Sequence, residues 1–168
     1  MMKTFLMIAL PAILLLSACE EPNNPFLPDP VEDRLEEDIA TIEAYLAENN
    51  ITAERHETGL FYRIMDEGEG NAMPTPNSEV LVHYKGYLLE DGSVFDETDG
   101  FDEEEGRDAQ LFSLSSTIDG WRIGMTLITK GGKIQLFVPS NLAYKNIERP
   151  GIPPYSILIF EIELVNFN

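Results

Sequence analysis

Basic residues are scarce in this chain. Its 168 residues include 30 acidic and 11 basic side chains, which gives a formal net charge of −19. A negative field of this size repels phosphate backbones, so we expect no nucleic-acid partner. An acidic run covers residues 97–108, but it lacks the D-x-D-x-D-G spacing of an EF-hand calcium loop. We therefore interpret it as a solvated loop.

Histidine and cysteine are also rare. The chain has two histidines, His56 and His83, and one cysteine, Cys19. A single cysteine cannot form a disulfide within the chain, and a zinc site lacks ligands. No G-x-S-x-G elbow is present to support a Ser-His-Asp triad, and no Gly-rich phosphate loop. We predict no metal and no cofactor, and we expect His83 to pack or to lie at the surface rather than to catalyse.

A long hydrophobic run occurs only at the start of the chain. Residues 4–18 form an apolar stretch of about 15 residues, shorter than the ~20 that a helix needs to span a bilayer. Residues 1–18 are therefore interpreted as a secretory signal peptide. The run ends in Leu-Ser-Ala-Cys at 16–19, which looks like the bacterial lipobox, whose cysteine is acylated and becomes the first mature residue.

Lipidation of Cys19 predicts a protein anchored to a lipid membrane in the bacterial cell envelope, periplasmic or at the outer membrane. Residues 19–30 would then form a linker, because 20–30 carries four prolines and few groups that can pack. Two alternatives stay open: secretion with cleavage elsewhere, and Cys19 as a reactive thiol or an intermolecular disulfide partner.

A helix is predicted next, within a segment 31–57 that also includes the connection to the following domain. Asp29 is a typical N-cap, Pro30 suits the first helical position, and the pattern continues to about Asn49. Apolar residues recur at spacings of three and four, which predicts one apolar stripe made of Val31, Leu35, Ile39, Ile42 and Leu46. The stripe either docks on the domain or pairs with a second copy of the chain.

Residues 80–96 carry the most informative pattern of the chain. Alternating residues from Val80 to Lys85 predict a strand, which Gly86 is expected to break. The turn Glu-Asp-Gly at 90–92 predicts a hairpin, and the chain re-enters as Ser-Val-Phe-Asp at 93–96. Such a hairpin would bring Tyr84, Phe95 and Asp96 to one concavity, which is the pocket hypothesis.

The rest of the chain predicts further strands and one short helix. Alternation indicates strands at 59–70, 111–114, 133–138 and 156–167, and a helix is expected from Gly120 to about Thr129. No internal repeat is visible.

The stretch VHYKGYLLEDGSVFD at 82–96 resembles VHYxGxLxDGxxFD, a signature of the FKBP-type peptidyl-prolyl isomerases. Further motifs of that family follow in order: Gly-Trp at 120–121, Val-Pro at 138–139, Leu-Ala-Tyr at 142–144 and IPPYSILIFEIEL at 152–164. The resemblance implies an α+β domain over residues 58–168, in which a curved antiparallel sheet of about five strands wraps round one short helix. The helix of segment 31–57 would be an addition to it.

The resemblance also assigns a site. It places the proline ring of a substrate on Trp121, although from its own sequence context this tryptophan reads as an ordinary core aromatic. It implies that Tyr144 donates a hydrogen bond to the carbonyl before the proline, and that Ile152 is the apolar tip of an overhanging loop. The implied catalytic residues are Tyr84, Phe95, Asp96, Tyr144 and Phe160, and the implied substrate-binding residues are Thr117, Ile118, Trp121 and Ile152.

The activity implied is cis/trans isomerisation of proline-containing exported polypeptides, with apolar residues favoured before proline and rapamycin as a possible inhibitor. A prolyl amide rotates over a barrier of roughly 18 to 20 kcal/mol. An apolar, dry cavity favours the twisted amide, in which charge separation is smaller, and no bond is made or broken. Asp96 would orient a tyrosine hydroxyl or hold the twisted carbonyl, and is not assigned as a general base.

Four features depart from the family pattern, namely Gln110, Thr117, Lys145 and the acidic run 97–108. We expect Gln110 and Thr117 to make one wall of the pocket more polar. Two other functions therefore stay open. One is a binding module or chaperone that binds proline segments without turnover. The other is a structural part of an envelope assembly with a vestigial pocket.

Overall fold

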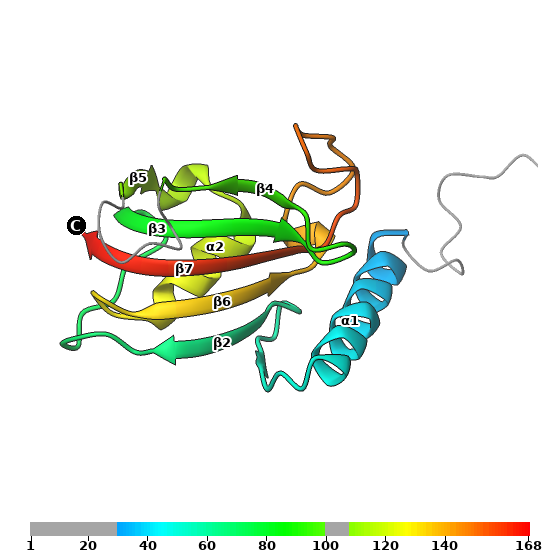
Figure 1. Cartoon of the computed structure of the whole chain (residues 1–168), viewed down its shortest axis with the longest axis horizontal. Coiled ribbons are helices and arrows are strands. Elements are labelled where there is room, and N and C mark those ends of the chain that lie inside the picture. Colours follow the sequence, from blue (N-terminus) through cyan, green and yellow to red (C-terminus); the bar gives the residue numbers. More distant parts are fainter. Residues whose placement is uncertain (1–29, 100–107) are drawn as a thin grey trace, which may run out of the picture.

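A computed structural model describes residues 30–99 and 108–168. One antiparallel sheet curves round a short helix, and a longer helix lies across one end of the sheet (Figure 1). The helices are α1 (Pro30–Glu48) and α2 (Asp119–Gly124), with 3₁₀ turns η1 (Leu114–Ser116), η2 (Met125–Leu127) and η3 (Ser140–Leu142). The strands are β1 (Glu54–Arg55), β2 (Phe61–Asp66), β3 (Glu79–Leu88), β4 (Val94–Glu97), β5 (Gln110–Ser113), β6 (Lys133–Val138) and β7 (Leu158–Phe167).

The sheet has the order β1-β2-β6-β7-β3-β4, and β5 also pairs with β3. Its centre is the long antiparallel pair of β3 and β7, which runs from Val80 opposite Phe167 to Leu88 opposite Leu158. The α+β class is confirmed. The structure has seven strands, more than the five or so expected. The count includes β1, which has only two residues, and it includes β4 and β5 as separate strands because they pair with different parts of β3.

The strand β3 differs from the prediction at Gly86. The strand continues through this residue to Leu88 instead of ending there. A Cβ atom at position 86 would lie 2.6 Å from Cζ of Phe95 and 2.9 Å from Cε1 of Phe160. Glycine is therefore needed because two aromatic rings pack directly on the strand backbone.

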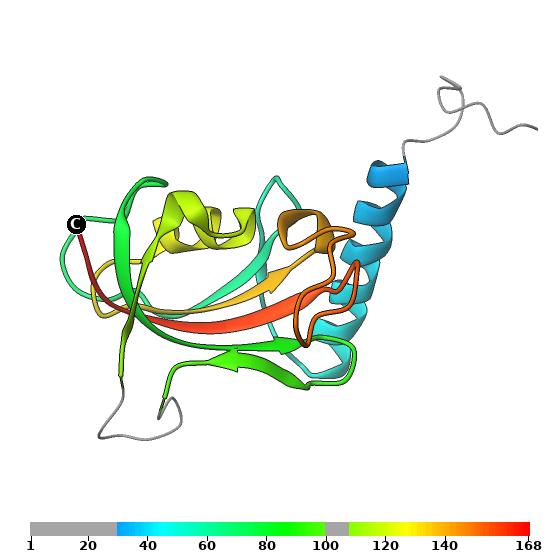
Figure 2. The same ribbon diagram turned by 90° about the horizontal axis from the view of Figure 1, so that it is seen from above.

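The concave face of the sheet packs on α2 (Figure 2). The contact is close because two glycines, Gly120 and Gly124, face β6. A Cβ at Gly120 would lie 2.5 Å from Cγ1 of Val138, and one at Gly124 would lie 2.6 Å from Cδ1 of Leu136. This close approach fixes the position of Trp121, which is 4% exposed. The α-helical part of this segment ends at Gly124, and a 3₁₀ turn continues it to Leu127, two residues short of the predicted end.

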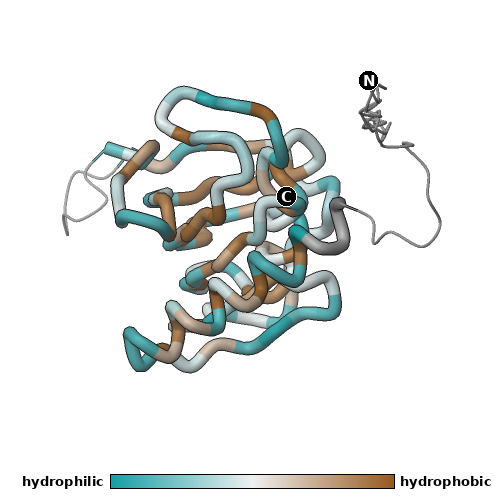
Figure 3. The backbone as a smooth tube through the Cα atoms, turned by 90° about the vertical axis from the view of Figure 1, so that its right-hand side faces the viewer, coloured by the Kyte–Doolittle hydropathy of each residue, from teal (hydrophilic) through white to brown (hydrophobic). Residues whose placement is uncertain are grey.

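The helix α1 packs on the opposite face of the sheet. Its stripe residues Ile39, Ile42 and Leu46 are buried against Phe61, Leu89, Phe137 and Ile159. Apolar and polar segments alternate along the helix in Figure 3. Of the two predicted alternatives, the structure therefore has the stripe docked on the domain, where it removes apolar surface from water.

Several predictions concern residues outside the described ranges. Cys19, the signal peptide 1–18, the linker 19–29 and most of the acidic run 97–108 fall there. Within the ranges that the structure describes, no helix is long and apolar enough to cross a membrane.

Candidate active site

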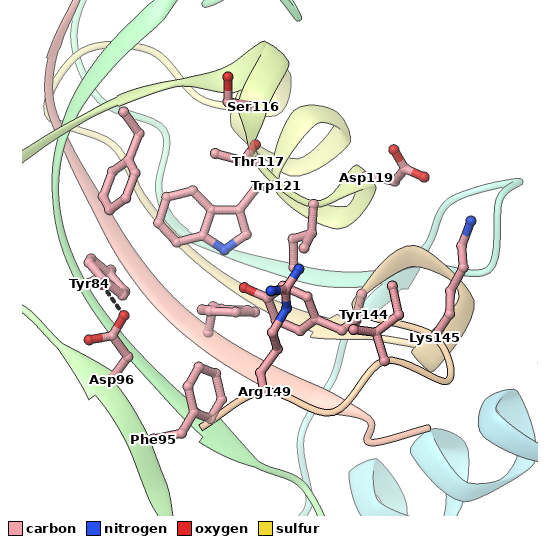
Figure 4. A pocket seen from close by; sticks show the side chains of 15 residues that line it. Tyr84, Phe95, Asp96, Ser116, Thr117, Asp119, Trp121, Tyr144, Lys145 and Arg149 are labelled. Carbon is pink, nitrogen blue, oxygen red and sulfur yellow. Dashed lines mark hydrogen bonds between the residues drawn. The ribbon is translucent and has the colours of Figure 1, made fainter. Parts of the chain in front are cut away.

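A cavity of about 470 Å³ lies between the concave face of the sheet, α2 and the loop that follows β6 (Figure 4). This volume is within the usual range for small-molecule sites. Eight of the nine predicted catalytic and substrate-binding residues line it, namely Tyr84, Phe95, Asp96, Thr117, Ile118, Trp121, Tyr144 and Phe160. The pocket hypothesis is therefore supported by the placement of residues that lie up to 76 positions apart in the chain.

The bottom of the cavity is a cluster of aromatic rings centred on Trp121. Its ring centroid lies 5.3 Å from those of Tyr84 and Phe112, and 5.4 Å from that of Phe160, all in edge-to-face orientation. Such pairs each contribute about 0.5–1.5 kcal/mol beyond the area that they bury. The indole is thus held in one orientation, with its face available as a platform.

The carboxylate of Asp96 is fixed by Tyr84. The Tyr84 hydroxyl donates a hydrogen bond of 2.5 Å to Oδ2 of Asp96 (Figure 4). Burial, followed by this hydrogen bond, raises the pKa of the Tyr84 phenol well above its ordinary value. The phenol is therefore neutral near neutral pH and acts as the donor. The predicted contact of Asp96 with a tyrosine hydroxyl is therefore present. In this contact Asp96 accepts a hydrogen bond, and it does not need to act as a general base.

A second phenol, Tyr144, lies on the other side of the cavity. Burial is the main cause that raises its pKa, while the nearby charge of Arg149 lowers it. The guanidinium carbon of Arg149 lies 5.3 Å from the centre of the Tyr144 ring. Tyr144 therefore stays protonated and can donate a hydrogen bond into the cavity.

The position of Ile152 differs from the prediction. Its side chain is 5% exposed and packs in the main core, so it does not form the tip of a loop over the cavity. Backbone hydrogen bonds between Ile152 and Arg149 close the loop at this point. An apolar side chain of the loop that does line the cavity is Ile147, which is 52% exposed.

The expectation that Gln110 and Thr117 make one wall of the cavity more polar also needs correction. Gln110 is exposed and does not line the cavity, whereas Phe112, two residues further along β5, does. Thr117 lines the cavity, but its hydroxyl donates a hydrogen bond of 2.8 Å to the carbonyl of Leu114. The polarity of Thr117 is therefore used within the protein.

Sequence reasoning missed several lining residues. The omitted ones are Phe112, Ser116, Asp119, Ala143, Ile147 and Arg149. The alternation of β5 was a usable signal for Phe112, because period-2 spacing puts it on the face of β3 that carries Tyr84. No comparable signal exists for Ile147 and Arg149, which lie in an irregular loop.

Lys145 lines the cavity at the position where the family usually has glycine. Its φ is +56°, in the left-handed region that favours glycine. This conformation explains the usual glycine, and the lysine adopts it here at a cost of about 1 to 2 kcal/mol. The substitution also adds an ammonium group to the residues that line the cavity, which include Arg149.

Residues 30–99 and 108–168 contain no group of three or more His, Cys, Asp or Glu side chains that could hold an ion. Asp119, the other acidic residue of the cavity wall, forms an ion pair with Arg122 on the same helix.

Comparisons with known proteins agree with this geometry. The profile of the family described as FKBP-type peptidyl-prolyl cis-trans isomerase matches residues 70–165. FkpA of Escherichia coli, a protein named as an FKBP-type peptidyl-prolyl cis-trans isomerase, is 42% identical over 109 residues, which is 65% of this chain and 38% of FkpA. The chain thus spans about two fifths of the length of such curated relatives.

Solved structures give the same result. The crystal structure of FkpA from E. coli matches with a TM-score of 0.66 and 34% identity, over 82% of this chain and 62% of that one. The crystal structure of a peptidyl-prolyl cis-trans isomerase from Pseudomonas syringae matches with a TM-score of 0.66 and 28% identity, over 84% and 98%. With the profile covering more than half of its residues, this chain belongs to the FKBP-type peptidyl-prolyl cis-trans isomerase family.

Proposed function

We propose that this chain catalyses cis/trans isomerisation of Xaa-Pro bonds in proline-containing polypeptides. The observation that carries the proposal is the aromatic cavity built on Trp121, with Tyr84 and Asp96 hydrogen-bonded on one side and Tyr144 on the other. The cavity is aromatic at its bottom, and polar and charged side chains line the rest of its wall.

In this mechanism the proline ring rests on the indole of Trp121, and the carbonyl before the proline accepts a hydrogen bond from Tyr144. The twisted amide has less charge separation than the planar one, so the apolar rings of Phe95 and Phe160 favour it. Because Tyr84 holds Asp96 in place, the carboxylate is preorganised beside the rotating amide. Ile118 completes the wall beside the indole, and Ile152 supports the loop from below.

We expect apolar residues to be favoured before proline. The side chain of the residue before proline would lie near Phe95 and Ile147, both of which line the cavity. A comparison of Leu-Pro and Glu-Pro peptides of equal length tests this preference. We expect faster catalysis on the Leu-Pro peptide, and equal rates would contradict the arrangement.

Occupancy of the cavity can be followed separately from catalysis. The chain has one tryptophan, and it lies at the bottom of the cavity, so its fluorescence should change when a Leu-Pro peptide or rapamycin binds. A folded protein whose fluorescence responds to the peptide, but which does not accelerate its exchange, would be a proline-segment binding module rather than an enzyme. The charged groups of Lys145 and Arg149 at the rim favour this second candidate.

The proposed place of action is the bacterial envelope, where acylated Cys19 would anchor the chain to a lipid membrane, in the periplasm or at the outer membrane. The support for this is the lipobox-like sequence at 16–19 and the proline-rich segment after it. A Cys19→Ser variant, expressed with its own leader, should move from the membrane fraction to the soluble fraction. Retention in the membrane fraction would overturn the anchor, and a Ser17→Ala variant, which keeps a small residue before the cysteine, is the control.

A further inference from the structure

A buried carboxylate on α1 contacts the loop that carries Tyr144. Asp38 is 4% exposed. Its Oδ2 accepts two hydrogen bonds from Ser140, one of 2.7 Å from the backbone N–H and one of 2.6 Å from the hydroxyl. Hydrogen bonds to an ionised acceptor are roughly twice as strong as those between neutral groups. Asp38 therefore fixes both the backbone and the side chain of Ser140.

Ser140 is the residue that organises the turn next to the cavity. It begins η3, and its carbonyl accepts hydrogen bonds from the N–H of Ala143, at 3.2 Å, and of Lys145, at 2.9 Å. The residues held in this way, Ala143 to Lys145, all line the cavity. One carboxylate of α1 is thus two hydrogen bonds away from the backbone on both sides of Tyr144.

A second contact joins α1 to the same loop. The guanidinium carbon of Arg34 lies 4.2 Å from the centre of the Tyr155 ring. The N–H of Tyr155 donates a hydrogen bond of 2.7 Å to the carbonyl of Lys145. The helix therefore holds the cavity loop at two separate points, Ser140 and Tyr155.

Docking alone does not require this carboxylate. The stripe of Ile39, Ile42 and Leu46 already buries α1 against the sheet. In the described part of the chain no lysine, arginine or histidine forms an ion pair with Asp38. A buried charge without a counter-ion costs free energy, so an apolar residue of similar size would suit simple packing better. The carboxylate differs from an apolar residue in that it accepts the two hydrogen bonds from Ser140.

We propose that Asp38 is a positioning residue for the cavity, which orients Tyr144 through Ser140. The helix that carries it lies outside residues 70–165, the part that matches the family profile. The N-terminal helix of this chain is thus part of the support of the site, in addition to packing on the sheet. This inference rests on the proposed function, because Tyr144 is the group that it positions toward the substrate.

The test compares two variants at Asp38 with a control in the whole protein. Asp38→Ala removes the acceptor, whereas Asp38→Asn keeps an oxygen that can accept both hydrogen bonds. Glu36→Ala, at an exposed position of the same helix, is the control. If the loop is less often in its binding geometry, the apparent affinity falls by that fraction. We expect Asp38→Ala to raise KM about tenfold with kcat within about twofold of wild type, and Asp38→Asn and the control to stay near wild type.

A merely structural role would give a different result. Partial unfolding lowers the number of active molecules, which decreases the apparent kcat and leaves KM unchanged. That outcome, or a wild-type KM in folded Asp38→Ala, would overturn the proposal, and so would an Asn variant that behaves like the Ala variant. If Asp38→Ala does not fold, Ser140→Ala removes only the shorter of the two bonds. That variant should raise KM about threefold, and an unchanged KM would then overturn the proposal.

Amide hydrogen exchange tests the same contact without catalysis. In Asp38→Ala the N–H groups of Ser140, Ala143 and Lys145 should exchange at least about tenfold faster, with those of β6 and β7 unchanged. If the wild-type protein does not accelerate cis/trans isomerisation of any proline peptide, the proposed function is wrong. The pattern of amide hydrogen exchange still decides whether Asp38 fixes the turn. Unchanged exchange at these three amides would overturn the inference whatever the activity.

Discussion

At the scale of single residues, the site depends on groups that are kept neutral or fixed by their neighbours. The Tyr84 phenol is buried and donates to Asp96, and Tyr144 is kept protonated mainly by burial. Both phenols are thus hydrogen-bond donors throughout the physiological pH range. The chemistry of amide rotation needs such donors and apolar rings, and it needs no group that changes protonation state.

Replacing Asp96 with leucine should reduce kcat/KM at least about tenfold, because the Tyr84 hydroxyl loses its partner and the cavity loses its preorganised carboxylate. The protein should stay folded, since Asp96 is exposed on β4. Kinetics on a Leu-Pro peptide, together with urea unfolding, measure both effects. Glu97→Leu changes the adjacent carboxylate, which pairs with Lys85 outside the cavity, and should leave kcat/KM unchanged. A folded Asp96→Leu variant with wild-type activity would contradict the site.

Because the pKa of Tyr84 is raised in the folded protein, the free energy of unfolding depends on pH in the alkaline range. Below the ordinary tyrosine pKa of 10.0 the phenol is protonated in both the folded and the unfolded chain, so it causes no pH dependence. Above that value the unfolded chain loses this proton while the folded chain keeps it, so the free energy of unfolding falls as pH rises. Urea unfolding at several pH values from 8 upward should show the decline at about pH 10, and Tyr84→Phe should show a smaller one. An equal decline in both proteins would contradict the assignment.

At the scale of elements, the contact between α2 and β6 positions Trp121. Gly124→Ala should destabilise the fold by about 1 to 3 kcal/mol, because the new methyl group would overlap Leu136 in a well-packed core. Alanine is the better helix former by about 1 kcal/mol, so the sign of the change shows which effect is larger. Urea unfolding measures it, and Leu136→Val in the same chain should recover part of the loss. A Gly124→Ala variant that is more stable than wild type would mean that α2 can shift away from β6 at little cost in free energy.

The elements that sequence predicted well are those with a clear period. The helix α1, the hairpin turn at Gly92 and the long strand β7 follow from periodicity and turn residues, and all three are present. The continuation of β3 through Gly86 could not be predicted in this way, because the reason lies in Phe95 and Phe160, whose rings reach the strand from elsewhere in the chain. The sequence alone does not distinguish a glycine that accommodates a neighbouring ring from a glycine that ends a strand.

The candidate site was predicted where the motif was local, and less well in the loop after β6. Tyr84, Phe95 and Asp96 belong to one hairpin, so their convergence followed from the strand pattern. Ile152 was expected at the rim but is buried, and Ile147 lies there instead. Backbone hydrogen bonds between residues 149 and 152 decide which side chain turns inward, and no apolar period encodes them.

At the scale of the whole molecule, the chain combines an acidic surface with a cavity whose bottom is aromatic. A net charge of −19 should keep copies of the protein apart and weaken contacts with other acidic proteins. The two rim cations, Lys145 and Arg149, are exceptions to this charge at the place where substrate would enter. The helix α1 packs across one end of the sheet, on the face opposite α2. The role proposed for its Asp38 would extend the support of the cavity beyond residues 70–165, the part that matches the family profile.

The measurement that tests the central claim most directly is the rate of cis/trans exchange of a Leu-Pro peptide with the chain that begins after Cys19, with and without rapamycin. Uncatalysed exchange takes tens of seconds or longer, so acceleration is easily detected. We predict acceleration that rapamycin removes, because peptide and inhibitor would occupy the same cavity above Trp121. A folded protein that leaves the rate at its uncatalysed value would contradict the account.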